Sequence, residues 1–413
     1  MIVKEEIEKK EIAKQYKELL RISYQTLSQE DKKLIRTAFD IAVEAHKEQR
    51  RKSGEAYIFH PISVAKIVAE EIGLDATSIA AALLHDVVED SETKLEDIER
   101  MMGNAVAKIV HGLTKISHLK KDKNISLQAE NFRKMLLTLN DDIRVIIIKI
   151  ADRLHNMQTM DAMPEYKQVK IASETLYIYA PLAHRIGLYN IKNELEDLSL
   201  KYTESDRYRS IKEKIEASKE AQDEYIKSFE EFVKSALNKE RLKYNIKGRA
   251  KSIYSIHRKI QMQNIGFEQV YDKFAIRIVY QAQRAKEKLI AWKIYSIITD
   301  HFTPNPTRLR DWITTPKSNG YEALHITVMG PQNKWIEVQI RSERMHEIAE
   351  KGYAAHYRYK QGVQKDIGIE EWLNRLQEVL ENNTGNAVDF GDAATGSHGK
   401  YTFANFSNGH GGL

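Results

Sequence analysis

Two histidines and two aspartates from three separate segments have the residue types of a divalent metal site. His60 stands just before Pro61 in YIFHPI, His85 and Asp86 follow the apolar run AALL, and Asp152 follows a second apolar run in IKIADRLHNM. Imidazole and carboxylate are ligands that ions such as Mn²⁺ accept together. A metal held by these residues would polarise a phosphate and lower the pKa of a bound water.

Two further carboxylates, Glu89 and Asp90, lie four positions after His85 and Asp86. On one continuous helix these four groups would share adjoining faces just after a buried segment. Either Glu89 or Asp90 could then hold or deprotonate the hydrolytic water. The alternative is a solvated, acidic helix end, because a chain with 14 His is expected to contain roughly one His-Asp pair by chance.

A short basic loop precedes these segments and ends in a hydroxyl. Arg51, Lys52 and Ser53 supply cationic and hydroxyl donors suited to a nucleotide or its phosphates. Taken alone, a solvated loop is the better interpretation of these three residues. Asn156 lies one helical turn after Asp152 and is predicted to share its face.

The second half of the chain carries polar groups on one face of predicted strands. In KWIEVQIR, Glu337, Gln339 and Arg341 point to the side opposite the aliphatic residues, and His325 and Arg277 are placed likewise in their own segments. A carboxylate, an imidazole and guanidinium groups on one sheet face suit phosphoryl transfer. The alternative is a sheet whose outer face meets water.

Two loops and one aspartate adjoin this face. Asp272 has the wrong parity for it, so it must precede its strand or follow a bulge to join the site. Arg249 and Lys251 stand beside a predicted turn at Gly248. Tyr321 follows the tight turn SNG, from which it could stack on a base or form a buried edge of the core.

The elements that must position these groups divide the chain into two parts. Apolar residues three and four apart predict helices over most of residues 5–200, and alternation predicts strands at 272–280, 321–329 and 334–341. We therefore expect a multidomain protein. It would comprise an all-α domain at 1–195, a solvated helical connector at 196–247, an α+β domain with a mixed sheet at 248–380 and a Gly-rich, disordered tail at 385–413.

Composition narrows the possible chemistry. The absence of Cys excludes disulfides, thiol nucleophiles and Fe–S clusters, so a metal must be held by His, Asp or Glu. A net charge of +5 fits an anionic substrate better than a dedicated nucleic-acid binder. No run of 18 apolar residues and no secretion signal occur, so no membrane partner is expected and a cytoplasmic location is the default.

The segments around His60, His85–Asp86 and Asp152, with AHRIGLYNIKNELEDL, resemble the hydrolase domain of the RelA/SpoT homologues, a branch of the HD phosphohydrolases. The resemblance implies removal of the 3'-pyrophosphate from ppGpp and pppGpp. It implies that His60, His85, Asp86 and Asp152 bind Mn²⁺, that Glu89 and Asp90 serve the water, and that Arg51, Lys52, Ser53 and Asn156 surround the nucleotide.

The second domain resembles the synthetase domain of the same family, so that the resemblance spans roughly residues 30–365. It implies a nucleotidyltransferase-like fold that transfers pyrophosphate from ATP to the 3'-oxygen of GDP or GTP. Asp272 and Glu337 would bind Mg²⁺, with Glu337 also the base for the 3'-hydroxyl. The implied ATP contacts are Arg249, Lys251 and Arg277, and the implied guanine-nucleotide contacts are Lys317, Asn319, Tyr321 and His325.

Two features depart from the family pattern. One family motif reads Arg-x-Lys-Asp in bifunctional members and Glu-x-Asp-Asp in members that only synthesise. This chain has Arg308-Leu309-Arg310-Asp311 at that place, so Arg310 replaces the Lys. The basic character is kept, which favours the bifunctional type. Long members also carry regulatory domains that sense uncharged tRNA on the ribosome. This sequence has the Gly-rich tail in their place, so no ribosome or tRNA binding is expected from this chain.

The function expected from these residues is that of a bifunctional enzyme acting on ppGpp, pppGpp, GDP, GTP and ATP. One alternative is a hydrolase whose synthetase domain is weak or inactive, or the reverse. A remote alternative is an RNA-binding module at 234–251, which the matching acidic content disfavours. Because both activities at full rate would merely convert ATP to AMP and pyrophosphate, we also expect two conformations with one site disfavoured in each.

Overall fold

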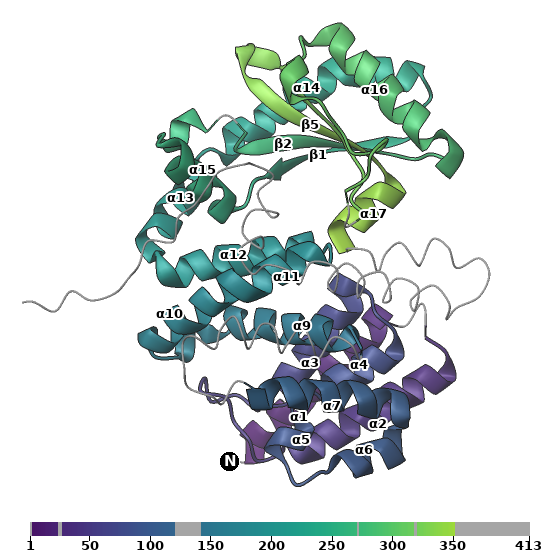
Figure 1. Cartoon of the computed structure of the whole chain (residues 1–413), viewed down its shortest axis with the longest axis vertical. Coiled ribbons are helices and arrows are strands. Elements are labelled where there is room, and N and C mark those ends of the chain that lie inside the picture. The colour runs from purple at the N-terminus through teal and green to yellow at the C-terminus, as the bar shows by residue number, and fades with distance from the viewer. Residues whose placement is uncertain (1, 24–26, 120–141, 271, 318–319, 352–413) are drawn as a thin grey trace, which may run out of the picture.

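The computed structural model describes residues 2–23, 27–119, 142–270, 272–317 and 320–351. Within this part, a helical half and a half built on one sheet lie at opposite ends of the molecule, with α12 (Tyr189–Thr203) between them (Figure 1). Asn319 and the predicted disordered tail at 385–413 lie outside the described residues.

The N-terminal half is helical, as predicted. Its helices are α1 (Ile2–Ser23), α2 (Gln29–Ala45), α3 (Phe59–Lys66), α4 (Ala76–Leu83), α5 (Val87–Asp90), α6 (Leu95–Met102), α7 (Asn104–Leu119), α9 (Arg144–Gln158), α10 (Glu165–Glu174), α11 (Ala180–Arg185) and α12, with π-helical turns at Ile67–Ile72 and Thr175–Tyr179. Apolar residues at helical spacing, such as Ile35, Ala38 and Phe39 on α2, join one core that extends from Tyr16 to Leu195.

The C-terminal half is built on a five-stranded mixed sheet. Its strands are β1 (Tyr244–Ala250), β2 (Phe274–Tyr280), β3 (Arg310–Asp311), β4 (Leu324–Met329) and β5 (Trp335–Ser342), in the order β1-β2-β5-β4-β3. The pair β2–β5 is parallel and the other three pairs are antiparallel. The predicted α+β class with a mixed sheet is therefore confirmed.

Within the described residues, five helices accompany the sheet: α13 (Ser205–Ala217), α14 (Lys219–Lys239), α15 (Ile253–Gln263), α16 (Glu287–His301) and α17 (Glu343–Lys351). Helices α14 and α16 cover its apolar face (Figure 1). The expectation of a fully solvated connector is wrong for α14, which buries Tyr225, Phe229, Val233 and Leu237 against the strands. Its dense charges occupy the opposite face, as in an amphipathic helix.

The predicted turn at Gly248 is wrong, because this glycine lies inside β1 and pairs with Ile276. A Cβ at position 248 would collide with Ile226 Cδ1 on α14. Glycine is therefore required by the close approach of the helix to the sheet and not by a turn. In the described part of the chain, no helix has the length and apolarity needed to cross a membrane.

Candidate active sites

The first candidate site lies where α3, the α4–α5 turn and α9 meet in the helical half. Ligand atoms of His60, His85 and Asp152 all lie within 4.8 Å of one another. His60 Nε2 is 3.2 Å from Asp152 Oδ1, and His85 Nε2 is 2.9 Å from Asp86 Oδ2. The structure therefore brings together the four residues predicted to hold a metal.

The orientation of His85 fits a metal ligand. Its Nδ1 lies 2.8 Å from the carbonyl oxygen of Ala82, so Nδ1 carries the hydrogen and donates it to that oxygen. Its Nε2 is buried and makes no hydrogen bond among the described residues, although it faces the carboxylates of Asp86 and Asp152. A buried ring nitrogen and two carboxylates that converge on one point form a donor set that suits a bound cation.

His60 is oriented the same way by a histidine that the sequence analysis did not single out. His60 Nδ1 and His155 Nδ1 are 2.8 Å apart, and Arg51 Nη1 also approaches His155 Nδ1 at 3.3 Å. Burial, then the charges of His60 and Arg51, lowers the pKa of His155 to about 3, so this ring is a neutral acceptor. His60 therefore donates from Nδ1 and turns Nε2 toward Asp152, a typical supporting contact of a metal ligand.

The acidic groups of this site are strongly perturbed. Burial would raise the pKa of Asp152, but Lys149, His60 and His85 hold it well below its ordinary value. Burial would likewise lower the pKa of His85, yet Asp86 and Asp152 raise it overall. Both shifts show that the site favours positive charge next to its carboxylates.

The prediction of one helix carrying His85 to Asp90 is wrong. Helix α4 ends at Leu83 and α5 begins at Val87, with a turn between them. Adjacent helical residues diverge by about 100°, so the break allows both His85 and Asp86 to face the cluster. Glu89 and Asp90 are exposed. Burial lowers the pKa of Lys149, but the charges of Asp152, Asp86 and Glu89 raise it overall. Burial and the charge of Asp86 raise the pKa of Asp90.

The nucleotide contacts predicted for this site are partly assembled. Arg51 Nη2 donates to Asn156 Oδ1 at 3.0 Å, and Asn156 Nδ2 donates to Asp152 Oδ1 at 2.6 Å. Lys52 and Ser53 are exposed in the same loop, and in the described structure neither side chain bonds to the cluster.

The sequence analysis did not identify two residues that support this site. Tyr57 OH donates to Asp86 Oδ2 at 2.7 Å, and Lys149 Nζ, which is buried, lies 3.6 Å from Asp152 Oδ2. A lysine inside the apolar run VIIIKIAD, one turn before a predicted ligand, was the available signal for Lys149. Tyr57 had no comparable signal.

The second candidate site lies on the polar face of the sheet. The register pairs Ala275 with Glu337 and Arg277 with Gln339, so the alternate residues of β2 and β5 share this face. A pocket of about 170 Å³ is lined by residues from β1, the segment before β2 and β5, among them Arg249, Lys251, Asp272 and Glu337. Two predicted ATP contacts and both predicted Mg²⁺ ligands therefore line one pocket.

Asp272 precedes β2, which is one of the two placements that its parity allowed. Its Oδ2 accepts a hydrogen bond from Lys251 Nζ at 2.6 Å and another from Lys259 Nζ. The sequence analysis did not name Lys259. Its Oδ1 is buried without a hydrogen-bond partner among the described residues. Burial opposes ionisation, but the two lysines lower the pKa of Asp272 below its ordinary value. A buried, ionised carboxylate with one unused oxygen fits a Mg²⁺ ligand.

Tyr321 is held between two polar side chains and one aromatic ring. Its hydroxyl lies 2.7 Å from His325 Nε2 and accepts from Arg341 Nη2 at 2.6 Å. Its ring is 8% exposed and lies 5.5 Å from the ring of Tyr189 on α12. Lys317 Nζ lies 5.3 Å from the Tyr321 ring, so three of the four predicted guanine-nucleotide contacts are neighbours.

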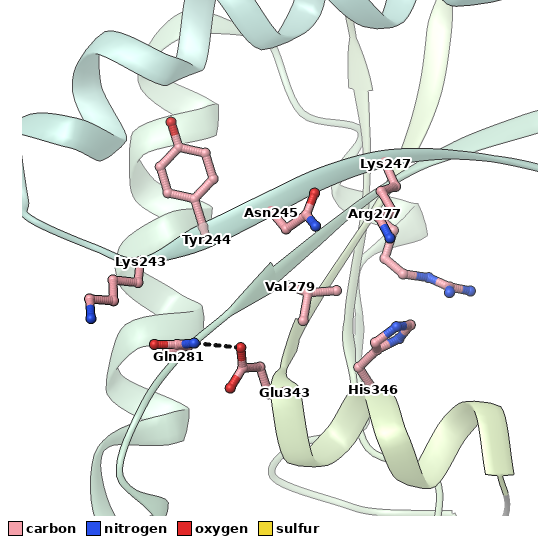
Figure 2. A pocket seen from close by; sticks show the side chains of 9 residues that line it. All are labelled: Lys243, Tyr244, Asn245, Lys247, Arg277, Val279, Gln281, Glu343 and His346. Carbon is pink, nitrogen blue, oxygen red and sulfur yellow. Dashed lines mark hydrogen bonds between the residues drawn. The ribbon is translucent and has the colours of Figure 1, made fainter. Parts of the chain in front are cut away.

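Arg277 lies between this site and a second pocket. The second pocket measures about 360 Å³, and its lining includes Lys247, Arg277 and His346 (Figure 2). Arg277 Nη1 donates to Glu350 Oε1 at 2.8 Å. Burial, and then the charge of Arg341, lowers the pKa of Arg277 to about 10.

Comparisons with known proteins agree with both halves. A family model described as HD domain matches residues 38–189, and one described as a region found in RelA / SpoT proteins matches residues 248–364. A GTP pyrophosphokinase of Myxococcus xanthus is 42% identical over 354 residues, covering 84% of this chain and 46% of that protein. The bifunctional (p)ppGpp synthase/hydrolase SpoT of Escherichia coli K12 is 39% identical over 371 residues, covering 89% and 52%.

Among solved structures, a metazoan ortholog of SpoT that hydrolyzes ppGpp is 27% identical and covers 42% of this chain and 94% of its own, with a TM-score of 0.34. The chain spans about half the length of the curated relatives it matches. Both family models occur in the order predicted from the motifs, the HD match first. The chain therefore belongs to the RelA/SpoT homologues.

Proposed function

We propose that this chain both hydrolyses and synthesises the guanosine alarmones ppGpp and pppGpp. The observation that carries the proposal is the presence, in one chain, of two separate sites with buried and unused metal-binding atoms, at His85 Nε2 and at Asp272 Oδ1. The printed names of the relatives, a bifunctional (p)ppGpp synthase/hydrolase and a GTP pyrophosphokinase, support the same assignment.

In the hydrolase site, His60, His85, Asp86 and Asp152 would hold Mn²⁺. The ion would supply Lewis acidity toward the 3'-pyrophosphate at neutral pH. Arg51 and Asn156 lie beside the cluster and would bind the nucleotide. Lys52 and Ser53 would meet it from the exposed part of the loop. Glu89 or Asp90 would accept the proton of the attacking water at a carboxylate oxygen.

In the synthetase site, Asp272 and Glu337 would hold Mg²⁺, which neutralises charge on the ATP phosphates. Lys251, now paired with Asp272, would move to phosphate oxygens, with Arg249 and Arg277 as further ATP contacts. Glu337 would accept the proton of the 3'-hydroxyl. The 3'-oxygen then bonds to the β-phosphorus of ATP while the bond from that phosphorus to the α–β bridging oxygen breaks, and AMP leaves.

The guanine nucleotide would be bound beside Glu337. Tyr321 would stack on the base, and Lys317, Asn319 and His325 would contact the nucleotide. His325 Nδ1 lies 3.8 Å from Glu337 Oε1, which is consistent with a substrate bound against both residues. Substrates of this kind are made and used inside cells, which supports a cytoplasmic location.

Nucleotide chromatography of two reactions tests the proposal. The purified chain with ATP, GDP and Mg²⁺ should yield AMP and ppGpp, and with ppGpp and Mn²⁺ it should yield GDP and pyrophosphate. The runner-up, a hydrolase with an inactive synthetase site, predicts only the second reaction. If neither reaction occurs, the proposed function is wrong.

A further inference from the structure

Two buried arginines share one carboxylate on the polar face of the sheet. Arg277 on β2 is 7% exposed and Arg341 on β5 is 1% exposed. Glu350 on α17 places its Oε1 2.8 Å from Arg277 Nη1 and 3.8 Å from Arg341 Nη1. Burying two positive charges beside one negative charge is unfavourable unless further anionic groups bind there.

The hydrogen-bonding capacity of this pair is largely unused. Nε and Nη2 of Arg277 and Nε and Nη1 of Arg341 are buried without a hydrogen-bond partner among the described residues. Arg341 uses its remaining nitrogen, Nη2, for Tyr321 and Gln339. One carboxylate has two oxygens, whereas a phosphate group presents three or more and carries a higher charge. The pair is therefore matched to a phosphate better than to Glu350.

A route for a ligand to reach the pair is present. The pocket in Figure 2 opens beside Arg277, and Lys247 and His346 stand at the same side of it. Its acidic residue, Glu343, accepts a hydrogen bond from Gln281 Nε2 at 2.7 Å. The approach to Arg277 is therefore open and mainly basic, as a polyanion requires.

We propose that Arg277 and Arg341 form a two-arginine site for a phosphate group of a nucleotide substrate, and that Glu350 occupies this site as an internal competitor until the phosphate displaces it. The proposal rests on the proposed function and adds Arg341 as a binding residue and Glu350 as the group that binding must displace. It also has a structural consequence. Asn190 on α12 donates to Glu350 O and to Glu350 Oε2, each at 3.1 Å, so displacement breaks a side-chain contact between α12 and α17.

The direct test measures binding of inorganic triphosphate to the full chain by calorimetry, without nucleotide. Glu350→Gln removes the competing charge and should bind triphosphate at least about fivefold more tightly than wild type. Glu343→Gln is the matched control. It removes a carboxylate from the same helix, but this carboxylate contacts Gln281 and not the arginines. Equal affinities of the two variants would overturn the proposal.

Thermal unfolding gives a second readout. Glu350→Gln leaves two buried arginines without their carboxylate, so its Tm without ligand should fall below that of Glu343→Gln, and triphosphate should raise it more than it raises wild type. If Glu350→Gln cannot be purified folded, Asn190→Ala serves instead. It removes the hydrogen bonds from Asn190 to Glu350, so triphosphate should bind about twofold more tightly. An unchanged affinity in Asn190→Ala would then count against the proposal.

Arg341→Lys tests the second arginine, because lysine keeps the charge and loses the fork of donors. It should weaken triphosphate at least about fivefold while ppGpp hydrolysis in the other half stays at the wild-type rate, which shows that the chain is folded. Separate titrations with a non-hydrolysable ATP analogue and with GDP identify the source of the phosphate, since only one should lose affinity in Arg341→Lys. Loss of neither contradicts the proposal. If synthesis fails while Glu350→Gln and Arg341→Lys change triphosphate affinity as expected, the proposed function is wrong and the phosphate site stands.

Discussion

The rings of Tyr189 and Tyr321 meet edge to face, with centroids 5.5 Å apart and planes at 71°. Tyr189 is the first residue of α12, which packs with the helical half, and Tyr321 precedes β4 in the sheet half. The residue proposed to stack on guanine is therefore packed against the other half of the chain. A base that stacks on Tyr321 has to compete with this contact or displace it.

Replacing Tyr189 should therefore favour the guanine nucleotide. An edge-to-face aromatic pair contributes about 0.5–1.5 kcal/mol, so Tyr189→Ala should lower the KM for GDP in the synthesis reaction by roughly twofold to tenfold. Tyr189→Phe keeps the ring and should leave this KM unchanged. Steady-state assays at saturating ATP measure both. The same KM in Tyr189→Ala and Tyr189→Phe would show that the ring contact does not oppose binding.

The hydrolase cluster should fail when one ligand is removed. Asp152→Ala deletes a proposed metal ligand that also accepts hydrogen from Asn156, so ppGpp hydrolysis should be abolished and bound Mn²⁺ should drop, while synthesis from ATP and GDP stays measurable. Asp161→Ala is the matched control, because Asp161 pairs with Lys201 outside the cluster. Mn²⁺-dependent hydrolysis retained in Asp152→Ala would sink the metal assignment.

The synthetase site should fail when one charge is removed without loss of shape. Glu337→Gln keeps the β5 register and volume but removes the carboxylate proposed to bind Mg²⁺ and accept a proton, so synthesis should fall at least about a hundredfold. Hydrolysis of ppGpp, assayed in parallel, should hardly change. A parallel loss of both activities would make Glu337 structural and count against two separate sites.

The sequence predicted the cluster of His60, His85 and Asp152 because two of these residues, His85 and Asp152, follow strongly apolar runs, which fix where their segments are buried. His85 and Asp152 could be placed on that basis, but the break between α4 and α5 could not. It is set by His85 donating to Ala82 O and by both His85 and Asp86 facing one point, and these are tertiary demands that override helix periodicity.

In the sheet half, alternation predicted the polar face. Parity left Asp272 either before its strand, where it lies, or after a bulge. Strand β1 was missed because YNIKGRA is largely exposed and reads as a turn around Gly248. The role of this glycine depends on contact with Ile226 of α14, which lies 22 residues earlier in the chain and shares no sequence motif with it. Glu350 was missed because its significance depends on Arg277, Arg341 and Asn190 converging on it.

Acid should destabilise the sheet half through buried histidines. Burial lowers the pKa of His325 to about 4 although Glu337 opposes the shift, and burial with the charge of Arg277 lowers the pKa of His346 to about 4. An unfolded histidine titrates near pH ~6.5. Between these values the unfolded chain binds protons that the folded chain does not, so this stability is complete above pH ~6.5 and is lost as pH falls through about 4.

Urea unfolding at a series of pH values, followed by Trp fluorescence, measures this loss, because none of the four Trp in the sequence lies before residue 292. One pKa unit corresponds to about 1.4 kcal/mol, so His325 should account for about 3 kcal/mol of the decline in unfolding free energy. His325→Gln cannot titrate and should flatten the decline by that amount. His301→Gln, an exposed histidine on α16, should leave it as in wild type. Identical pH profiles for the two variants would show that His325 is not held neutral by its surroundings.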